Sequence, residues 1–309
     1  MPREHSDFRP LSEEFPISAG DYLAITEQFL SNTGINLGFS KRPMLLARLS
    51  KRLRVLGLSG FGEYRRLLES PNGQSELEQM ISLLTTNVTR FFREGRHFED
   101  LAANVLPDLI DRARNGDRIR LWSAGCSSGE EPFSLAFTLL TQCPDALDLD
   151  IKVLATDIDS QVLSKGQNAV YQKSNLLNLP HGVLEKFFDP VPENPDSFEV
   201  CLAARQLVSF KKLNLVEDWP FSGFFDVILC RNVVIYFENT TQEKLWVQFA
   251  KHMKPNSNLY LGHSERLSPS ALKNFRSVGD TRYVRAHNLL NSGRELLGAS
   301  RENGVAYEP

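Results

Sequence analysis

The chain has 309 residues, of which 41% are hydrophobic and 24% are charged, and it carries a formal net charge of -3. This length predicts one large domain with a smaller one beside it. The near balance of charge excludes general attraction to nucleic acid, so any polyanionic partner has to meet a local basic patch. No stretch approaches the roughly 20 apolar residues of a membrane span, and the start lacks the apolar core of a signal peptide. We therefore expect a cytoplasmic protein without membrane insertion.

The sequence contains no recognisable pattern of metal ligands. Its four cysteines are scattered without a CxxC pair, and its six histidines form no cluster with ligand spacing. Scattered cysteines fit a reducing compartment and argue against a structural zinc site. We predict that the protein holds no metal.

Residues 1–20 are polar and are expected to form a loose arm. Residues 21–85 have a helical apolar pattern throughout, interrupted by glycines, which predicts a small all-helical domain. In its second helix, leucines from Leu45 to Leu56 share one face, which we assign to the core. A neighbouring face carries four cations, Lys41, Arg48, Lys51 and Arg52.

This basic face is either solvated charge or a docking surface for an acidic partner. Glu63 is the only acid between Lys41 and Arg66, although many other cations lie in that stretch. Because so little negative charge compensates them, we favour the docking interpretation.

Residues 86–117 are predicted to be a linker and a helix, with a hinge candidate at Thr85 to Asp100. Asn87, Thr89 and Arg93 place polar and cationic groups within two turns there. Thr86 or Asn87 can also simply cap the next helix, which we expect over residues 101–113.

The segment from Arg118 to Leu140 predicts a strand, a tight loop and a helix. An alternating apolar run breaks into small residues, Ser123 to Gly129, which would let a ligand lie against backbone amides. Glu130 and Glu131 then place negative charge at the start of the helix, where they would repel a phosphate. A cationic ligand suits this site better, so we predict a pocket for S-adenosylmethionine (AdoMet).

The second strand of this region, residues 151–157, ends in Asp157. At the carboxyl end of such a strand, a carboxylate can accept hydrogen bonds from both ribose hydroxyls of a bound nucleoside. Asp159 is expected to cap the following helix instead. The same spacing is compatible with a dinucleotide-binding fold, but the loop carries only Gly125 and Gly129 in place of the G-x-G-x-x-G pattern.

Residues 170–210 predict a small antiparallel insert. Its strand candidates are Phe198 to Leu202 and Gln206 to Phe210, and they follow a proline-bearing loop from Asp189 to Pro195.

The segment that follows the insert, Phe225 to Cys230, is predicted to be a buried parallel strand. Arg231 and Asn232 come at its carboxyl end, which favours a ligand-binding role over that of merely satisfied polar groups. Thr240, with Glu243 three residues later, is expected to cap a helix. Strands over residues 258–262 and 281–284 follow, and residues 288–309 are expected to form a loose tail.

These segments together closely resemble the CheR-type chemoreceptor glutamate methyltransferases, over about residues 17–287. The resembling segments, in chain order, are TTNVTRFFRE (Thr85 to Glu94), WSAGCSSGEEPFSLA (Trp122 to Ala136), ATDID (Ala155 to Asp159), Asn214-Leu215, CRNVVIYF (Cys230 to Phe237) and GHSE (Gly262 to Glu265). The resemblance implies a helical N-terminal domain. It also implies a class I AdoMet methyltransferase domain over residues 118–287, with a doubly wound α/β sheet and a small antiparallel β-insert.

The resemblance also implies roles for individual residues. Asn87, Thr89 and Arg93 would contribute to the cofactor pocket, with Glu130 at the methionine or amino end. Asp157 would hold the ribose, while Asn214 and Leu215 would border the adenine. Arg231 and Asn232 would close the site, and Tyr236 would lie near the transferred methyl group. Arg93, Arg231 and Tyr236 are the candidate catalytic residues.

The implied reaction transfers a methyl group from AdoMet to glutamates of cytoplasmic chemoreceptor methylation helices, giving methyl esters and S-adenosylhomocysteine (AdoHcy) in chemotaxis adaptation. The basic face of the helical domain would meet those acidic helices. Family members that tether to a receptor's C-terminal pentapeptide carry a glycine-rich turn in the insert, whereas FFDPVPENPDSFEV (Phe187 to Val200) contains no glycine. We therefore expect recognition without this tether. The alternatives are a class I methyltransferase for another substrate and a non-catalytic AdoMet-binding adaptor.

Overall fold

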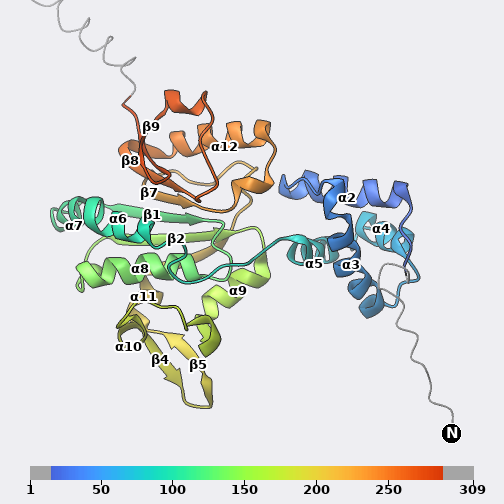
Figure 1. Ribbon diagram of the computed structural model, residues 1–309, viewed down its shortest axis with the longest axis horizontal. Helices are drawn as coiled ribbons and strands as arrows, with labels where there is room; N and C mark the ends of the chain where they lie inside the picture. Colours follow the sequence, from blue (N-terminus) through green and yellow to red (C-terminus); the bar gives the residue numbers. More distant parts are fainter. Residues whose placement is uncertain (1–14, 288–309) are drawn as a thin grey trace, which may run out of the picture.

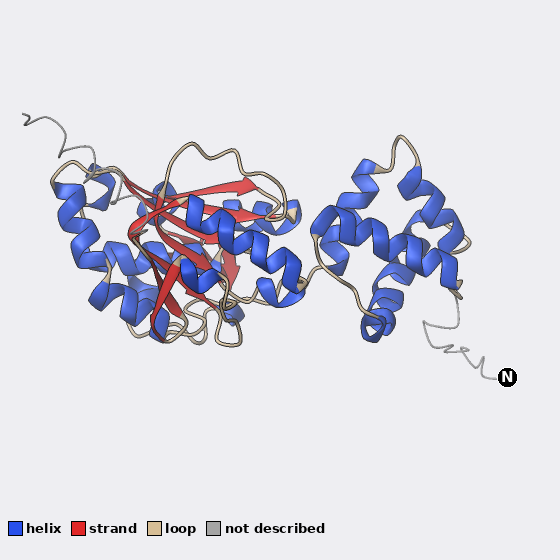
Figure 2. Cartoon of the chain, turned by 90° about the horizontal axis from the view of Figure 1, so that it is seen from above, coloured by secondary structure: helices blue, strands red, loops and turns tan. Residues whose placement is uncertain are grey.

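The computed structural model describes residues 15–287, so the predicted tail and most of the predicted N-terminal arm lie outside the described part. Figures 1 and 2 show two lobes, a helical lobe built by α2 to α5 and a larger α/β lobe, joined by an extended segment. No helix of the described part is long and apolar enough to cross a membrane.

Within the described residues, the helical lobe contains four α-helices around one core. They are α2 (Ala19–Thr33), α3 (Arg42–Leu56), α4 (Phe61–Glu69) and α5 (Gln74–Leu84). Ser18 caps α2, because its Oγ accepts a hydrogen bond from the amide of Asp21 at 3.0 Å. Leu45, Leu49 and Leu53 of α3 are fully buried, which confirms the predicted core face.

The linker region differs from its prediction in two ways. In place of one helix there are two, α6 (Arg96–Asn104) and α7 (Leu106–Arg114), and the break falls at Val105 because Pro107 disfavours a continuous helix there. Neither Thr86 nor Asn87 caps a helix, since α6 begins only after Gly95. Residues 86–95 therefore precede the first helix of the linker, and their side chains are not committed to capping it.

The α/β lobe is built on a sheet of seven strands in the order β6-β2-β1-β7-β8-β10-β9. The strands are β1 (Ile119–Ala124), β2 (Ile151–Asp157), β6 (Val208–Lys212), β7 (Phe225–Cys230), β8 (Met253–Leu261), β9 (Phe275–Gly279) and β10 (Arg282–Arg285). The first five in spatial order pair in parallel, and β10 is antiparallel to both of its neighbours. This arrangement confirms the predicted doubly wound α/β class, and β9 is a strand that the sequence pattern did not predict.

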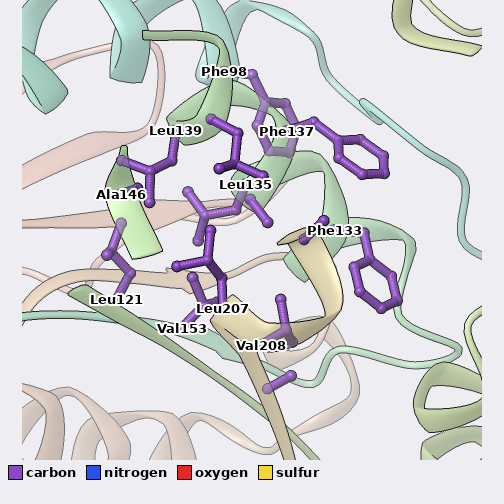
Figure 3. Close-up of a cluster of buried hydrophobic side chains, with 14 of the residues drawn as sticks. Phe98, Leu121, Phe133, Leu135, Phe137, Leu139, Ala146, Val153, Leu207 and Val208 are labelled. Atoms are coloured by element: carbon purple, nitrogen blue, oxygen red, sulfur yellow. The ribbon is translucent and has the colours of Figure 1, made fainter. Parts of the chain in front are cut away.

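Helices cover both faces of the sheet. On one face, α8 (Glu130–Gln142) packs over the first strands, and Figure 3 shows its Leu135 and Leu139 in a cluster with Leu121 of β1 and Val153 of β2. On the other face, α12 (Asn239–Lys251) packs beside Trp122 of β1, in keeping with the alternation of side chains along a strand. The predicted cap at Thr240 is wrong: Glu238 is the N-cap residue, and its side chain makes no capping bond.

The β-insert is a separate three-stranded antiparallel sheet in the order β3-β5-β4. Its strands are β3 (Val170–Gln172), β4 (Phe188–Val191) and β5 (Asn194–Val200). Two expectations were wrong here. The candidate Gln206 to Phe210 overlaps β6, which extends the main sheet beside β2, and the expected loop from Asp189 to Pro195 is itself a hairpin. Prolines are tolerated in such a small sheet at edge positions or where no ladder bond is needed.

Candidate active site

A cleft of about 940 Å³, including its open mouth, lies at the carboxyl edge of β1, β2 and β7. This is where a doubly wound sheet binds its ligands. Its walls come from the sheet edge, the linker and the end of α2. The cleft brings together nearly all of the predicted site residues, namely Asn87, Thr89, Arg93, Asp157, Asn214, Leu215, Arg231, Asn232 and Tyr236.

The loop after β1 is held close to the sheet by its backbone. The amides of Gly125 and Cys126 both donate to the carbonyl of Thr156, at 2.8 and 2.9 Å. Gly125 has a φ of +82°, and a Cβ atom there would lie 2.3 Å from the Val233 side chain. Only glycine fits this position without a shift of its neighbours, so the packing of the loop against Val233 requires Gly125.

Asp157 ends β2 at the floor of the cleft. One carboxylate oxygen accepts a hydrogen bond from the amide of Ser127 at 2.8 Å, and the other accepts one from the amide of Asp159 at 3.0 Å. Burial of the carboxyl group raises its pKa from 3.8 to about 6. A carboxylate held in this way still has lone pairs for hydroxyl donors of a ligand.

Asp159 caps α9 (Ser160–Asn168), as predicted, by accepting a hydrogen bond from the amide of Gln161 at 2.9 Å. Its second oxygen accepts one from Nδ2 of Asn87 at 2.7 Å. The carbonyl of Asn87 in turn accepts a hydrogen bond from Oγ of Ser127 at 3.1 Å. These bonds tie the linker to the loops after β1 and β2.

The structure differs from the prediction at the start of α8. Glu130 is buried away from the cleft and accepts a hydrogen bond from Oγ of Ser128 at 2.7 Å, whereas Glu131 lines the cleft. Consecutive residues of a helix point about 100° apart, so one step along the chain moves a carboxylate out of the site. Burial raises the pKa of both carboxyl groups.

Arg231 is held between two carboxylates. Its Nη1 lies 3.0 Å from Oε2 of Glu131 and its Nη2 lies 3.0 Å from Oε2 of Glu94, while the guanidinium sits 5.5 Å from the ring centre of Phe98. The side chain is only 1% exposed. Although burial acts to raise the pKa of Glu94, the charge of Arg231 and further hydrogen bonds hold it below its usual value.

The engaged Nη atoms of Arg231 make it a poor candidate for receiving a substrate carboxylate. Arg93 is partly exposed in the cleft, and its Nη1 donates to the carbonyl of Val88 at 2.9 Å. Tyr236 lies in a short 3-10 helix, η4 (Val234–Tyr236), and also lines the cleft. Of the three candidate catalytic residues, Arg93 and Tyr236 are therefore the more accessible.

Two carboxylates that hold residues of the cleft in place, Glu94 and Glu265, were not singled out from the sequence. Glu265 is 3% exposed, and its carboxylate accepts hydrogen bonds from four backbone amides, those of Asn232, Val233, Val234 and Gly262, at 2.6 to 2.9 Å. It thereby fixes the turn after β7, where Asn232 has a φ of +59°. Both acids end segments that carried the family resemblance, which is the signal that could have identified them.

The cations of the predicted basic face differ in their surroundings. Lys41 and Lys51 are exposed. Arg52 forms an ion pair with the buried Glu76, at 2.6 Å, and Nη1 of Arg48 donates to two backbone carbonyls at the end of α5. Two of the four cations thus have structural partners, and the docking role of this face stays a prediction.

No group of His, Cys, Asp or Glu side chains within residues 15–287 has the arrangement of a metal site. All four cysteines lie in this range and are free thiols. The side chains that line the cleft include the carboxylates of Asp157 and Glu131, the partly exposed Arg93, and Tyr236.

Two family models match the chain. The CheR methyltransferase all-alpha domain matches residues 20–85, and the CheR methyltransferase SAM binding domain matches residues 87–284, where SAM is AdoMet. A probable chemotaxis protein methyltransferase of Rhizobium etli is 46% identical over 254 residues, covering 82% of this chain and 95% of the relative. The chemotaxis protein methyltransferase of Escherichia coli is 39% identical over 263 residues, covering 84% and 88% respectively.

Proposed function

The chain belongs to the CheR methyltransferase family of AdoMet-dependent enzymes, and we propose that it methylates glutamate side chains of chemoreceptors. The products would be glutamate methyl esters on the cytoplasmic methylation helices and AdoHcy. The reaction would then take place in the cytoplasm and serve chemotaxis adaptation. The observation that carries this proposal is that two half-buried carboxylates, Asp157 and Glu131, line one cleft.

The carboxylates of the cleft fit AdoMet better than a phosphate-bearing cofactor. Asp157 would accept hydrogen bonds from the ribose hydroxyls, and Glu131 would attract the amino group. Asn214 and Leu215 would border the adenine, while Asn87 and Thr89 would line the linker side. Glu131 takes the place that the sequence had suggested for Glu130, and Arg231 would hold Glu131 and Glu94 in position.

Bound AdoMet supplies an electrophilic methyl group. A glutamate side chain has an ordinary pKa near 4.3, so it is already an ionised nucleophile at neutral pH and needs no general base. The described residues that line the cleft include no histidine or lysine, in keeping with this. Catalysis would consist mainly of positioning, with Arg93 orienting the incoming carboxylate and Tyr236 placed beside the reacting centre.

The partner surface would be the basic face of α3. A groove lined by Arg48, Lys51 and Arg52 also includes Thr85 and Asn87, which line the cleft as well, so it leads from the basic face toward the cleft. An acidic helix laid along this groove would bring its glutamates to the cleft with matching charge.

We also propose that recognition needs no receptor pentapeptide. The turn between β4 and β5 is Pro192-Glu193, without glycine. Deleting the C-terminal pentapeptide of a receptor that has one should leave its methylation unchanged. Loss of methylation from this deletion alone would contradict the proposal.

The test of the function is transfer of labelled methyl from AdoMet to a panel of receptor cytoplasmic fragments, with RNA and small amines as competing acceptors. We expect label on receptor glutamates, released as methanol by mild base. Label on RNA or amines alone would favour another class I substrate, and AdoHcy binding without any transfer would favour the adaptor alternative.

A further inference from the structure

The β-insert reaches the loop after β1 through the side chain of Tyr171 in β3. The hydroxyl group of Tyr171 donates a hydrogen bond to the carbonyl of Ser128 at 2.8 Å. Tyr171 is 5% exposed, and burial raises the pKa of its phenol, so it keeps the donated proton at neutral pH. Since β3 belongs to the three-stranded sheet and β1 to the main sheet, this bond links two separate sheets.

The loop that accepts this bond has a strained backbone. Ser127 has a φ of +50°, in the left-handed region that residues other than glycine seldom adopt. The amide of this same residue donates to Oδ2 of Asp157 at 2.8 Å. A strained conformation persists only where the surroundings fix it. The amide therefore faces Asp157 only as long as contacts around the loop hold it there.

Contacts on both sides of Ser127 hold the loop. On one side, Oγ of Ser127 itself donates to the carbonyl of Asn87 at 3.1 Å. On the other side, Ser128 is bonded twice, because its Oγ donates to Glu130 at 2.7 Å and its carbonyl accepts from Tyr171. The bond from Tyr171 fixes the orientation of the peptide group that follows Ser128, and it comes from the insert.

The next residue, Gly129, shows how closely the insert approaches the loop. It has a φ of +98°, and a Cβ atom there would lie 2.8 Å from the hydroxyl oxygen of Tyr171 and 3.0 Å from Cα of Gly166 in α9. Neither the left-handed backbone nor this contact suits a side chain. A larger residue would displace the hydroxyl group from Ser128.

Aromatic rings hold Tyr171 itself in place. Its ring packs edge to face on Phe91 of the linker and on Phe133 of α8, with ring centres 4.8 and 6.3 Å apart. Phe188 of β4 packs edge to face on Phe91 as well, at 5.4 Å. Such pairs stabilise beyond the area that they bury. The insert, the linker and α8 together therefore fix where the hydroxyl group lies.

We propose that Tyr171 is a positioning residue of the AdoMet site, which acts through the loop after β1 on Asp157, so that the β-insert contributes to cofactor affinity. This rests on the proposed placement of the ribose at Asp157. It gives the insert a role that does not depend on recognition of a receptor.

The test removes one oxygen atom. Tyr171→Phe keeps the ring packing but leaves the carbonyl of Ser128 without its donor. In calorimetry with the full chain, we expect AdoHcy to bind about tenfold more weakly. In methyl transfer, the KM for AdoMet should rise by a similar factor while kcat changes little, because the loss is one of binding. Wild-type affinity in Tyr171→Phe would overturn the proposal.

Tyr260→Phe is the matched control. Tyr260 is also buried, and its hydroxyl group donates to Asp100 at 2.6 Å, but neither residue lines the cleft. This variant should lower thermal stability and leave AdoHcy affinity within about twofold. An equal loss of affinity in both variants would show general loosening and would also overturn the proposal.

A double-mutant cycle tests the route through Asp157. Adding Tyr171→Phe to Asp157→Asn should weaken AdoHcy binding by less than about twofold more, because the ribose contact that Tyr171 supports is already impaired. Full additivity of the two losses would contradict this route. If Asp157→Asn alone leaves affinity intact, the proposed cofactor placement is wrong. If it weakens binding while Tyr171→Phe does not, only the inference about Tyr171 fails.

Amide hydrogen exchange of the wild-type protein gives a readout that needs no variant, should Tyr171→Phe not fold. Saturating AdoHcy should slow exchange in residues 126–129 and in β3 together, and should leave β9 unchanged. Slower exchange in the loop with no change in β3 would overturn the proposal.

Discussion

Asp157→Asn should separate the stability of this protein from its cofactor affinity. The pKa of Asp157 is raised from 3.8 to about 6 in the folded protein, mainly by burial. The folded state therefore binds this proton more tightly than the unfolded chain. The contribution to stability is fully present below pH 3.8 and is lost as the pH rises through about 6.

The shift of about two pKa units corresponds to about 3 kcal/mol of destabilisation at neutral pH. Asparagine carries no charge to bury. However, its NH2 group would face one of the two backbone N–H donors, and the lost hydrogen bond would lower the free energy of unfolding by about 1–2 kcal/mol. In urea unfolding at pH 7.5 without ligand, Asp157→Asn should therefore be more stable than wild type by about 1 kcal/mol. The exposed Asp148→Asn serves as the control and should change stability little.

Cofactor affinity should move in the opposite direction. Two hydroxyl hydrogen bonds to an ionised carboxylate are worth about 3 kcal/mol or more, so Asp157→Asn should bind AdoHcy about 100-fold more weakly. For the wild type, calorimetry should show affinity falling as the pH drops below about 6, because binding favours the ionised carboxylate. The asparagine variant should not show this fall. Wild-type affinity in Asp157→Asn, or wild-type binding that is independent of pH between 5 and 8, would refute this role for the carboxylate.

Four further predictions concern carboxylates and the basic face. Glu131→Gln should weaken AdoHcy binding about tenfold, whereas Glu130→Gln should leave it within about twofold; the reverse order in calorimetry would restore the original assignment. Glu265→Gln would turn an amide toward two backbone N–H donors and should lower the free energy of unfolding by about 3 kcal/mol or more in urea. Lys51→Glu should reduce receptor methylation several-fold without changing AdoHcy affinity, and unchanged methylation would remove Lys51 from the docking surface. Arg52→Glu should instead lower the melting temperature, because it faces a buried carboxylate.

The sequence alone was sufficient to predict the features that are determined by a few neighbouring residues. The apolar run of β7, the acid that ends β2 and the cap at Asp159 follow from strand burial, strand ends and helix capping, and these operate over a few residues. The order of motifs also identified the family, which no single motif could do. Assigning Asp157 and Asp159 to different roles needed only their positions relative to the strand and the helix.

The features that the sequence did not show depend on the direction in which a helical side chain points, or on contacts with residues far away in the sequence. The choice between Glu130 and Glu131 depends on the rotation of α8, which neighbouring residues do not reveal. The strand β6 looked like part of the insert because its pairing with β2 is nonlocal. Arg52 looked like surface charge because its partner, Glu76, is 24 residues away. The hydrogen bond between Asn214 and the carbonyl of Asn32 was missed for the same reason, since the two residues are 182 positions apart.

The most direct test of the proposed activity is methyl transfer from labelled AdoMet to a purified receptor cytoplasmic fragment, followed by mapping of the labelled residues. We predict base-labile methyl esters on glutamates of the methylation helices, with AdoHcy formed in equal amount. They should be absent when those glutamates are replaced by alanine. Base-stable label, or label that persists after the glutamates are replaced, would contradict the proposed reaction.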